Sequence, residues 1–256
     1  MGTLKVGAFV DSFKMGVRPG IERIAELGLD GFQVYVTKGE MHPDNFSPEA
    51  RKEFKRFVAD KGLEISALCG DFFQGFTDEE KNREIVPLTK KVIDVAVDLE
   101  TPIITTHVGV IPEDSNDPVW GVMSRALEDV GAYADSRGVC FATETGPEDG
   151  WVLRKFIEGL DTRAVRVNLD PANLVRKGFD VLECVRELGP YIVHTHAKDG
   201  KRTGGEVPLG EGDVPWKAYI AALKEIGFDG YYVIEREHGD DPAADIAQAA
   251  EFLRRF

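Results

Sequence analysis

Eight short apolar runs, separated by segments with helical spacing, constrain the fold of this chain most. The runs cover residues 4–10, 31–36, 64–70, 102–109, 139–146, 165–170, 191–199 and 231–237. They are rich in Val and Ile rather than strictly alternating, as in parallel strands that are buried on both faces. Because strands and helices alternate throughout, the sequence predicts a parallel α/β fold. The 256 residues match the usual length of one (β/α)8 barrel.

The segments between the runs carry helix start and stop signals. We expect helices at about 19–28, 48–61, 77–99, 118–137, 151–158, 181–188 and 214–226, and a last one that closes the chain. Pro87 is expected to kink or divide the third of these eight helices. A doubly wound open sheet would show a Gly-rich phosphate turn after the first strand, but VDSFKMGV does not fit GxGxxG. We therefore predict a single TIM-barrel domain over residues 1–256.

Charge and cysteine usage exclude several classes of protein. The chain has 31 Lys and Arg against 45 Asp and Glu, a net charge of −14 that would repel nucleic acid. No stretch approaches the ~18 apolar residues of a membrane helix. Cys69, Cys140 and Cys184 are isolated, which argues against a thiolate zinc site. Because no secretory signal is evident, we expect a cytoplasmic protein; a homo-oligomer is left open.

Four polar residues stand at or near the ends of four consecutive runs: Glu144, Asp170, His196 and Glu235. Barrel strands bring their C-terminal ends to one mouth, so these side chains can reach a common centre. Three crowded carboxylates would repel one another without a cation. An oxygen-rich set with one imidazole suits Mn²⁺, Mg²⁺ or Co²⁺. We predict one bound divalent ion, with Mn²⁺ as first choice; a salt-bridge network with Lys198 and Arg236 is the alternative.

Four further residues are candidates for substrate binding. His107 ends the fourth run and is either a substrate ligand or a core histidine. Asn173 could donate to a substrate hydroxyl or cap a turn. Lys198 could neutralise an oxyanion, and Arg202 could reach a polar ligand. Arg202 lies in a Gly-rich loop, residues 200–216, which is either a lid or a plain connection.

Several motifs resemble one known family. SALCGD, THVG, TETGP, NLDPAN, VHTHAKDG, PLGEGDVPW and VIERE are similar to the xylose-isomerase-like TIM-barrel superfamily of sugar isomerases and epimerases, over essentially the whole chain. In its ketose 3-epimerase branch the four matching positions bind one divalent ion, usually Mn²⁺ or Co²⁺. The resemblance implies that Glu144 and Glu235 are also the acid–base pair, and Arg202 matches a substrate-binding Arg.

The sequence departs from that branch at two positions. Asn173 stands where those epimerases carry a His, and Gln33 stands where many members carry an acid. The substrate therefore stays open. Members of the superfamily that act on abasic DNA carry additional histidine ligands. Five histidines in all, together with the negative charge, argue against that activity.

The expected chemistry is proton abstraction next to a carbonyl through an enediolate, with Glu144 and Glu235 as acid and base. This predicts a metal-dependent epimerase or isomerase that acts on a small sugar or sugar derivative. A dehydratase or lyase acting on an inosose or 3-keto sugar is one alternative, and a non-catalytic sugar-binding accessory subunit is another. No Gly-rich phosphate cradle follows the last two strands, which favours an unphosphorylated sugar.

Overall fold

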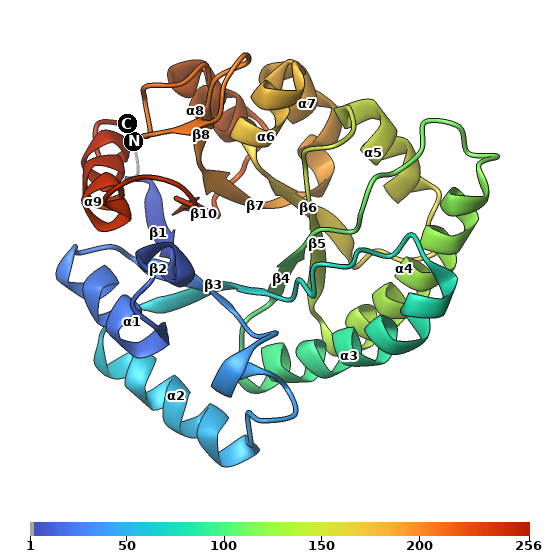
Figure 1. The fold of residues 1–256 in the computed structure, drawn as a ribbon, viewed down its shortest axis with the longest axis horizontal. Coiled ribbons are helices and arrows are strands. Elements are labelled where there is room, and N and C mark those ends of the chain that lie inside the picture. The colour runs from blue at the N-terminus through green and yellow to red at the C-terminus, as the bar shows by residue number, and fades with distance from the viewer. Residues whose placement is uncertain (1–2) are drawn as a thin grey trace.

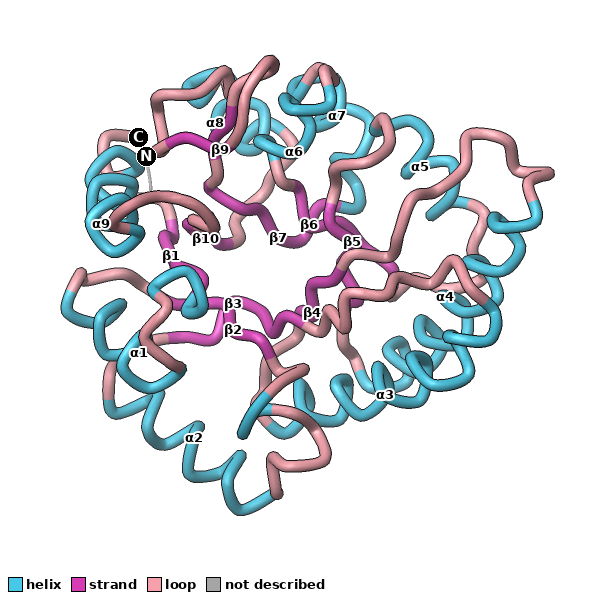
Figure 2. Tube along the Cα trace, in the orientation of Figure 1, coloured by secondary structure: helices cyan, strands magenta, loops and turns pink. Residues whose placement is uncertain are grey.

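Eight parallel strands close into a barrel in the computed structural model, which describes residues 3–256. Around the barrel the order is β1, β10, β7, β6, β5, β4, β3, β2. Figures 1 and 2 show the strands at the centre and the helices around them. The strands are β1 (Lys5–Phe9), β2 (Gly31–Tyr35), β3 (Glu64–Cys69), β4 (Ile103–Thr106), β5 (Cys140–Glu144), β6 (Val165–Leu169), β7 (Ile192–Ala197) and β10 (Tyr231–Ile234). Each lies inside one of the eight apolar runs, and the predicted barrel is confirmed.

Nine α-helices occur in the described part of the chain, where eight were expected. They are α1 (Val17–Glu26), α2 (Pro48–Asp60), α3 (Glu79–Asp98), α4 (Pro118–Arg137), α5 (Gly150–Glu158), α6 (Pro171–Lys177), α7 (Val181–Leu188), α8 (Trp216–Glu225) and α9 (Pro242–Leu253). Oxygen-bearing side chains cap several of them, as Ser47 does for α2 and Asp78 for α3. None of these helices is both long and apolar enough to cross a membrane.

One helix was missed, and one of the two outcomes predicted for Pro87 is wrong. Helix α3 is not divided at Pro87 but continues through it from Glu79 to Asp98. Helix α6 was missed because its seven residues are too few to show a periodic pattern. Its start could have been recognised, since Asp170 accepts a hydrogen bond from the backbone N–H of Asn173 and Pro171 occupies the first turn.

The Gly-rich loop after β7 is not a plain connection. It contains a short antiparallel hairpin of β8 (Asp199–Gly200) and β9 (Glu206–Val207). The buried carboxylate of Asp199 holds the loop together by accepting five N–H groups, which belong to the backbone of Gly200, Gly210, Gly212 and Val214 and to the indole of Trp216.

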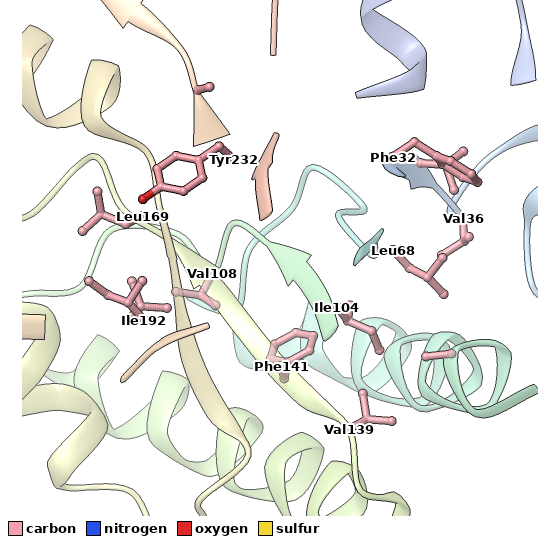
Figure 3. Packing of buried hydrophobic residues seen from close by; sticks show 14 of the residues in the cluster. Phe32, Val36, Leu68, Ile104, Val108, Val139, Phe141, Leu169, Ile192 and Tyr232 are labelled. Atoms are coloured by element: carbon pink, nitrogen blue, oxygen red, sulfur yellow. The ribbon is translucent and has the colours of Figure 1, made fainter. Parts of the chain in front are cut away.

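The barrel has an apolar outer layer and a polar interior at the mouth. Phe32, Leu68, Ile104 and Phe141 are fully buried in one large cluster with the helices (Figure 3). Because side chains alternate along a strand, neighbouring positions point into the barrel. Gln33, next to Phe32, is buried there and hydrogen-bonds to side chains from β4 and β7. The polar groups of the site therefore lie on rigid strands inside the barrel.

Candidate active site

The structure brings the four strand-end residues together. Glu144 ends β5, Asp170 follows β6, His196 lies in β7 and Glu235 follows β10. All four are buried, and each offers one ligand atom within 4.8 Å of the others. A second, more exposed group of Glu206, Glu237 and His238 also meets this spacing. There, however, Arg236 and the backbone N–H of Glu237 already donate to the carboxylate of Glu206.

His196 stands at the centre of the cluster. Its Nδ1 atom lies 3.1 Å from Oε2 of Glu235, 3.5 Å from Oδ2 of Asp170 and 3.6 Å from Oε2 of Glu144. On the other side of the ring, Nε2 lies 2.9 Å from Oε1 of Gln33. The amide of Gln33 donates to Thr105, which leaves Oε1 as the acceptor for an N–H at Nε2. Nδ1 is therefore the ring nitrogen that faces the three carboxylates, and it becomes available to a cation when its own proton is released.

Two buried polar atoms of this cluster have no hydrogen-bond partner in the described chain. They are Nδ1 of His196 and Oδ2 of Asp170. The other oxygen of Asp170 caps α6 by accepting from the backbone N–H of Asn173. An unsatisfied buried carboxylate oxygen is costly, so this arrangement suits a bound cation.

The cluster perturbs the titration of its own members. Burial alone would lower the pKa of His196, but Glu235 and Glu144 reverse this and raise that pKa well above its ordinary value. Burial would raise the pKa of Glu235, but His196 and Lys198 lower it to about 2. The carboxylates thus create a strong local preference for positive charge.

Lys198 contributes one fixed positive charge. Its buried Nζ lies 3.0 Å from Oε2 of Glu235 and 3.2 Å from Oε1 of Glu237. Lys198 therefore takes part in the alternative salt-bridge network, but Arg236 does not, because it pairs with Glu206 and Asp245 instead, each at 2.7 Å. This ammonium group adds to the positive charge that the raised pKa favours on His196, beside the three carboxylates of the cluster.

His107 and Asn173 both reach Glu144. Nε2 of His107 lies 3.4 Å from Oε1 of Glu144, and the amide of Asn173 donates to the same oxygen at 2.9 Å. His107 also contacts Asp71, with 2.8 Å between Nδ1 and Oδ2. Glu144 is the main cause that raises the pKa of His107 to about 11, although burial opposes the shift. Asp71 was missed in the sequence, yet it lies two residues after the end of β3 and carries the same strand-end signal.

Arg202 lies apart from the cluster. Its guanidinium donates to the carbonyl of Gly178 at 3.2 Å, and its backbone N–H donates to Asp213. A pocket of about 380 Å³ opens beside the cluster. Its lining consists of His107, Thr145, Gly146, Pro147, Asn173, Arg176, Lys177 and Gly204. Arg202 is not in that lining, whereas two basic residues of the missed helix α6 are. The contacts of Arg202 thus give its predicted role as a substrate ligand no support.

Comparisons with known proteins agree with this architecture. A family model described as xylose isomerase-like TIM barrel matches residues 21–256. The L-ribulose-5-phosphate 3-epimerase of Salmonella paratyphi C is 26% identical over 89% of this chain and 85% of its own length. The inosose dehydratase of Clostridium perfringens is 22% identical over 90% and 84%. A xylose isomerase domain protein from Planctomyces limnophilus superposes with a TM-score of 0.86 at 28% identity, covering 98% of this chain and 95% of that one. The chain belongs to the xylose isomerase-like TIM-barrel family.

Proposed function

We propose that this protein is a divalent-metal-dependent epimerase or isomerase that acts on a small sugar. The observation that carries the proposal is that Nδ1 of His196 and Oδ2 of Asp170 are buried between two further carboxylates without a hydrogen-bond partner in residues 3–256. One of the relatives is an L-ribulose-5-phosphate 3-epimerase, which supports the same class of reaction.

The residues of the cluster fit a hard divalent ion. Oδ2 of Asp170, Nδ1 of His196 and one oxygen each of Glu144 and Glu235 would hold it, and Mn²⁺ suits three carboxylates with one imidazole. When bound, such an ion polarises a substrate carbonyl and its neighbouring hydroxyl. Gln33 would support the site by keeping the proton of His196 on Nε2.

Glu144 and Glu235 would move the proton. Glu144 ends β5 and Glu235 follows β10, and these strands are separated in the barrel by β6 and β7, so the two carboxylates could approach a substrate from two sides. One carboxylate would remove the proton next to the carbonyl, and the other would return a proton. Lys198, 3.0 Å from Glu235, would stabilise negative charge that develops on the substrate oxygen. His107 and Asn173 would orient a hydroxyl beside Glu144.

Metal analysis and isotope exchange test this proposal. The purified protein should bind Mn²⁺ in about equimolar amount, and Asp170→Asn should weaken that binding strongly, while Asp213→Asn at an exposed loop position should not. With Mn²⁺ and a panel of ketoses and inososes in D₂O, deuterium should enter one substrate carbon. Glu144→Gln and Glu235→Gln should each abolish the exchange. The proposal is wrong if the natural protein binds no divalent ion, or if it exchanges no proton with any member of the panel.

Dehydration is the second candidate reaction, because the relatives include an inosose dehydratase. The same proton abstraction followed by loss of a β-hydroxyl would give it. Product mass decides between the two reactions, since an epimer keeps the mass of the substrate and a dehydration product has lost one water.

A further inference from the structure

The pocket beside Glu144 differs in charge from the rest of this acidic protein. Its inner end is formed by His107 and Asn173, which both contact Glu144. Its outer end is formed by Arg176 and Lys177 of α6 and by Gly204 of the β8–β9 hairpin. None of the lining residues is an Asp or Glu, although the chain carries 45 of them against 31 Lys and Arg. The pocket therefore favours negative charge at the end away from the cluster.

Arg176 and Lys177 are available to a ligand. Neither side chain forms an ion pair or a hydrogen bond within residues 3–256, and both are exposed. By contrast, the neighbouring Lys201 pairs with Asp213, and Lys198 is buried among carboxylates. A guanidinium and an ammonium side by side can together bind an oxyanion, the first through paired N–H groups and the second as a compact charge.

The stem of Arg176 is held in place by close packing. Helix α6 lies beside β8 (Figure 1), and a Cβ atom at Gly200 would come within 3.1 Å of Cγ and Cδ of Arg176. The glycine thus makes room for the aliphatic part of the arginine against the hairpin. A side chain that is partly ordered beforehand loses less conformational entropy when its charged end binds a ligand.

We propose that Arg176 and Lys177 form an anion subsite of the active site, so that the substrate is a sugar that carries a phosphate or carboxylate group. This inference rests on the proposed function. The reacting carbon lies at Glu144, and the anionic group extends along the pocket to the C-terminal end of α6. A sugar with an anionic group differs from the unphosphorylated sugar that the sequence favoured, since no Gly-rich phosphate cradle follows the last two strands. Here side chains of α6 supply the positive charge that the backbone of such a cradle would otherwise provide.

Binding measurements on the Mn²⁺-loaded protein test the subsite by affinity rather than by turnover. The probes are orthophosphate, L-ribulose 5-phosphate, L-ribulose and L-ribonate, titrated calorimetrically at fixed ionic strength. The test variant is Arg176→Gln with Lys177→Gln. The matched control is Arg186→Gln with Lys217→Gln, which removes the same charge from two exposed residues without a described ion pair and outside the pocket.

We expect at least one of the two sugar anions to bind about tenfold or more tightly than L-ribulose. The α6 double variant should lose that advantage, and the control should keep it. A preference for L-ribulose 5-phosphate and orthophosphate identifies a phosphate site, and a preference for L-ribonate identifies a carboxylate site. The subsite is refuted if no anion binds the natural protein, or if both double variants bind every probe equally.

Failure of the anion subsite can be distinguished from failure of the proposed function. Glu235→Gln should stop deuterium exchange, whereas Arg176→Gln with Lys177→Gln should weaken anion binding, because Glu235 lies in the metal cluster and the two basic residues lie in the pocket lining. Selective anion binding without any deuterium exchange would refute the proposed function alone. Exchange on neutral sugars, with equal binding by both double variants, would refute the subsite alone.

Discussion

Asp199 organises the loop between β7 and α8, and its replacement by Asn gives a measurable test of that network. Oδ1 accepts from the backbone of Gly200 and Val214. Oδ2 accepts from Gly210, Gly212 and the indole of Trp216, at 2.9, 3.2 and 2.8 Å. Asn keeps only one acceptor oxygen, so at least two buried N–H groups would face its NH₂ group. Each unsatisfied donor costs about 1–3 kcal/mol, which gives roughly 2–6 kcal/mol of lost stability.

Thermal unfolding followed by circular dichroism is the assay for Asp199→Asn. For a chain of this size, 1 kcal/mol corresponds to roughly 2–4 °C, so Tm should fall by about 4 °C or more. Glu211→Gln is the matched control, because it removes the same charge from the same loop at an exposed residue whose side chain has no described hydrogen bond or ion pair, where substitutions usually change stability by less than about 0.5 kcal/mol. Equal Tm values for the two variants would refute the view that Asp199 holds this loop.

Three further predictions concern closely packed or buried positions. Gly212→Ala should lower Tm by several degrees, because the new Cβ would lie 1.8 Å from Oδ1 of Asp199. Burial raises the pKa of Glu148 to about 8 from 4.5, against the opposing N–H of Ile111. The folded protein then holds a proton that the unfolded chain releases, so stability is full below about pH 4.5 and falls as pH rises to about 8. Glu148→Gln should remove this fall and be more stable than the natural protein at pH 9, by as much as a few kcal/mol. Gln33→Met removes the acceptor for Nε2–H of His196 and should weaken Mn²⁺ binding by about 10–100-fold.

Each of the three has its own control. Gly205→Ala meets no atom within 4 Å and should leave Tm unchanged; a similar loss in both glycine variants would contradict the steric argument. Glu113→Gln, in the exposed loop before α4, should show no difference that depends on pH. If it matches Glu148→Gln, burial is not the cause. Gln33→Glu retains an acceptor and should keep Mn²⁺ affinity, whereas equal losses in both Gln33 variants would show that the hydrogen bond is unimportant.

The barrel and the strand-end cluster could be predicted from local patterns in the sequence. Runs of Val and Ile mark parallel strands that are buried on both faces, and their alternation with helical segments indicates a barrel. Glu144, Asp170, His196 and Glu235 could be grouped because every parallel strand of a barrel ends at the same mouth. Helix α6 was not found, since seven residues carry too little periodicity.

Only the tertiary structure decided which residues that lie far apart in the sequence contact each other. Gln33 orients His196 across 163 residues, and its side chain reaches that ring only because β2 and β7 belong to one closed barrel. Asp71 meets His107, and Arg176 packs on Gly200, for the same reason. Residue type and spacing determine which side chains arrive at the mouth. Barrel closure and strand register determine which atoms face each other there, because a shift by one residue turns a side chain to the other face of the sheet.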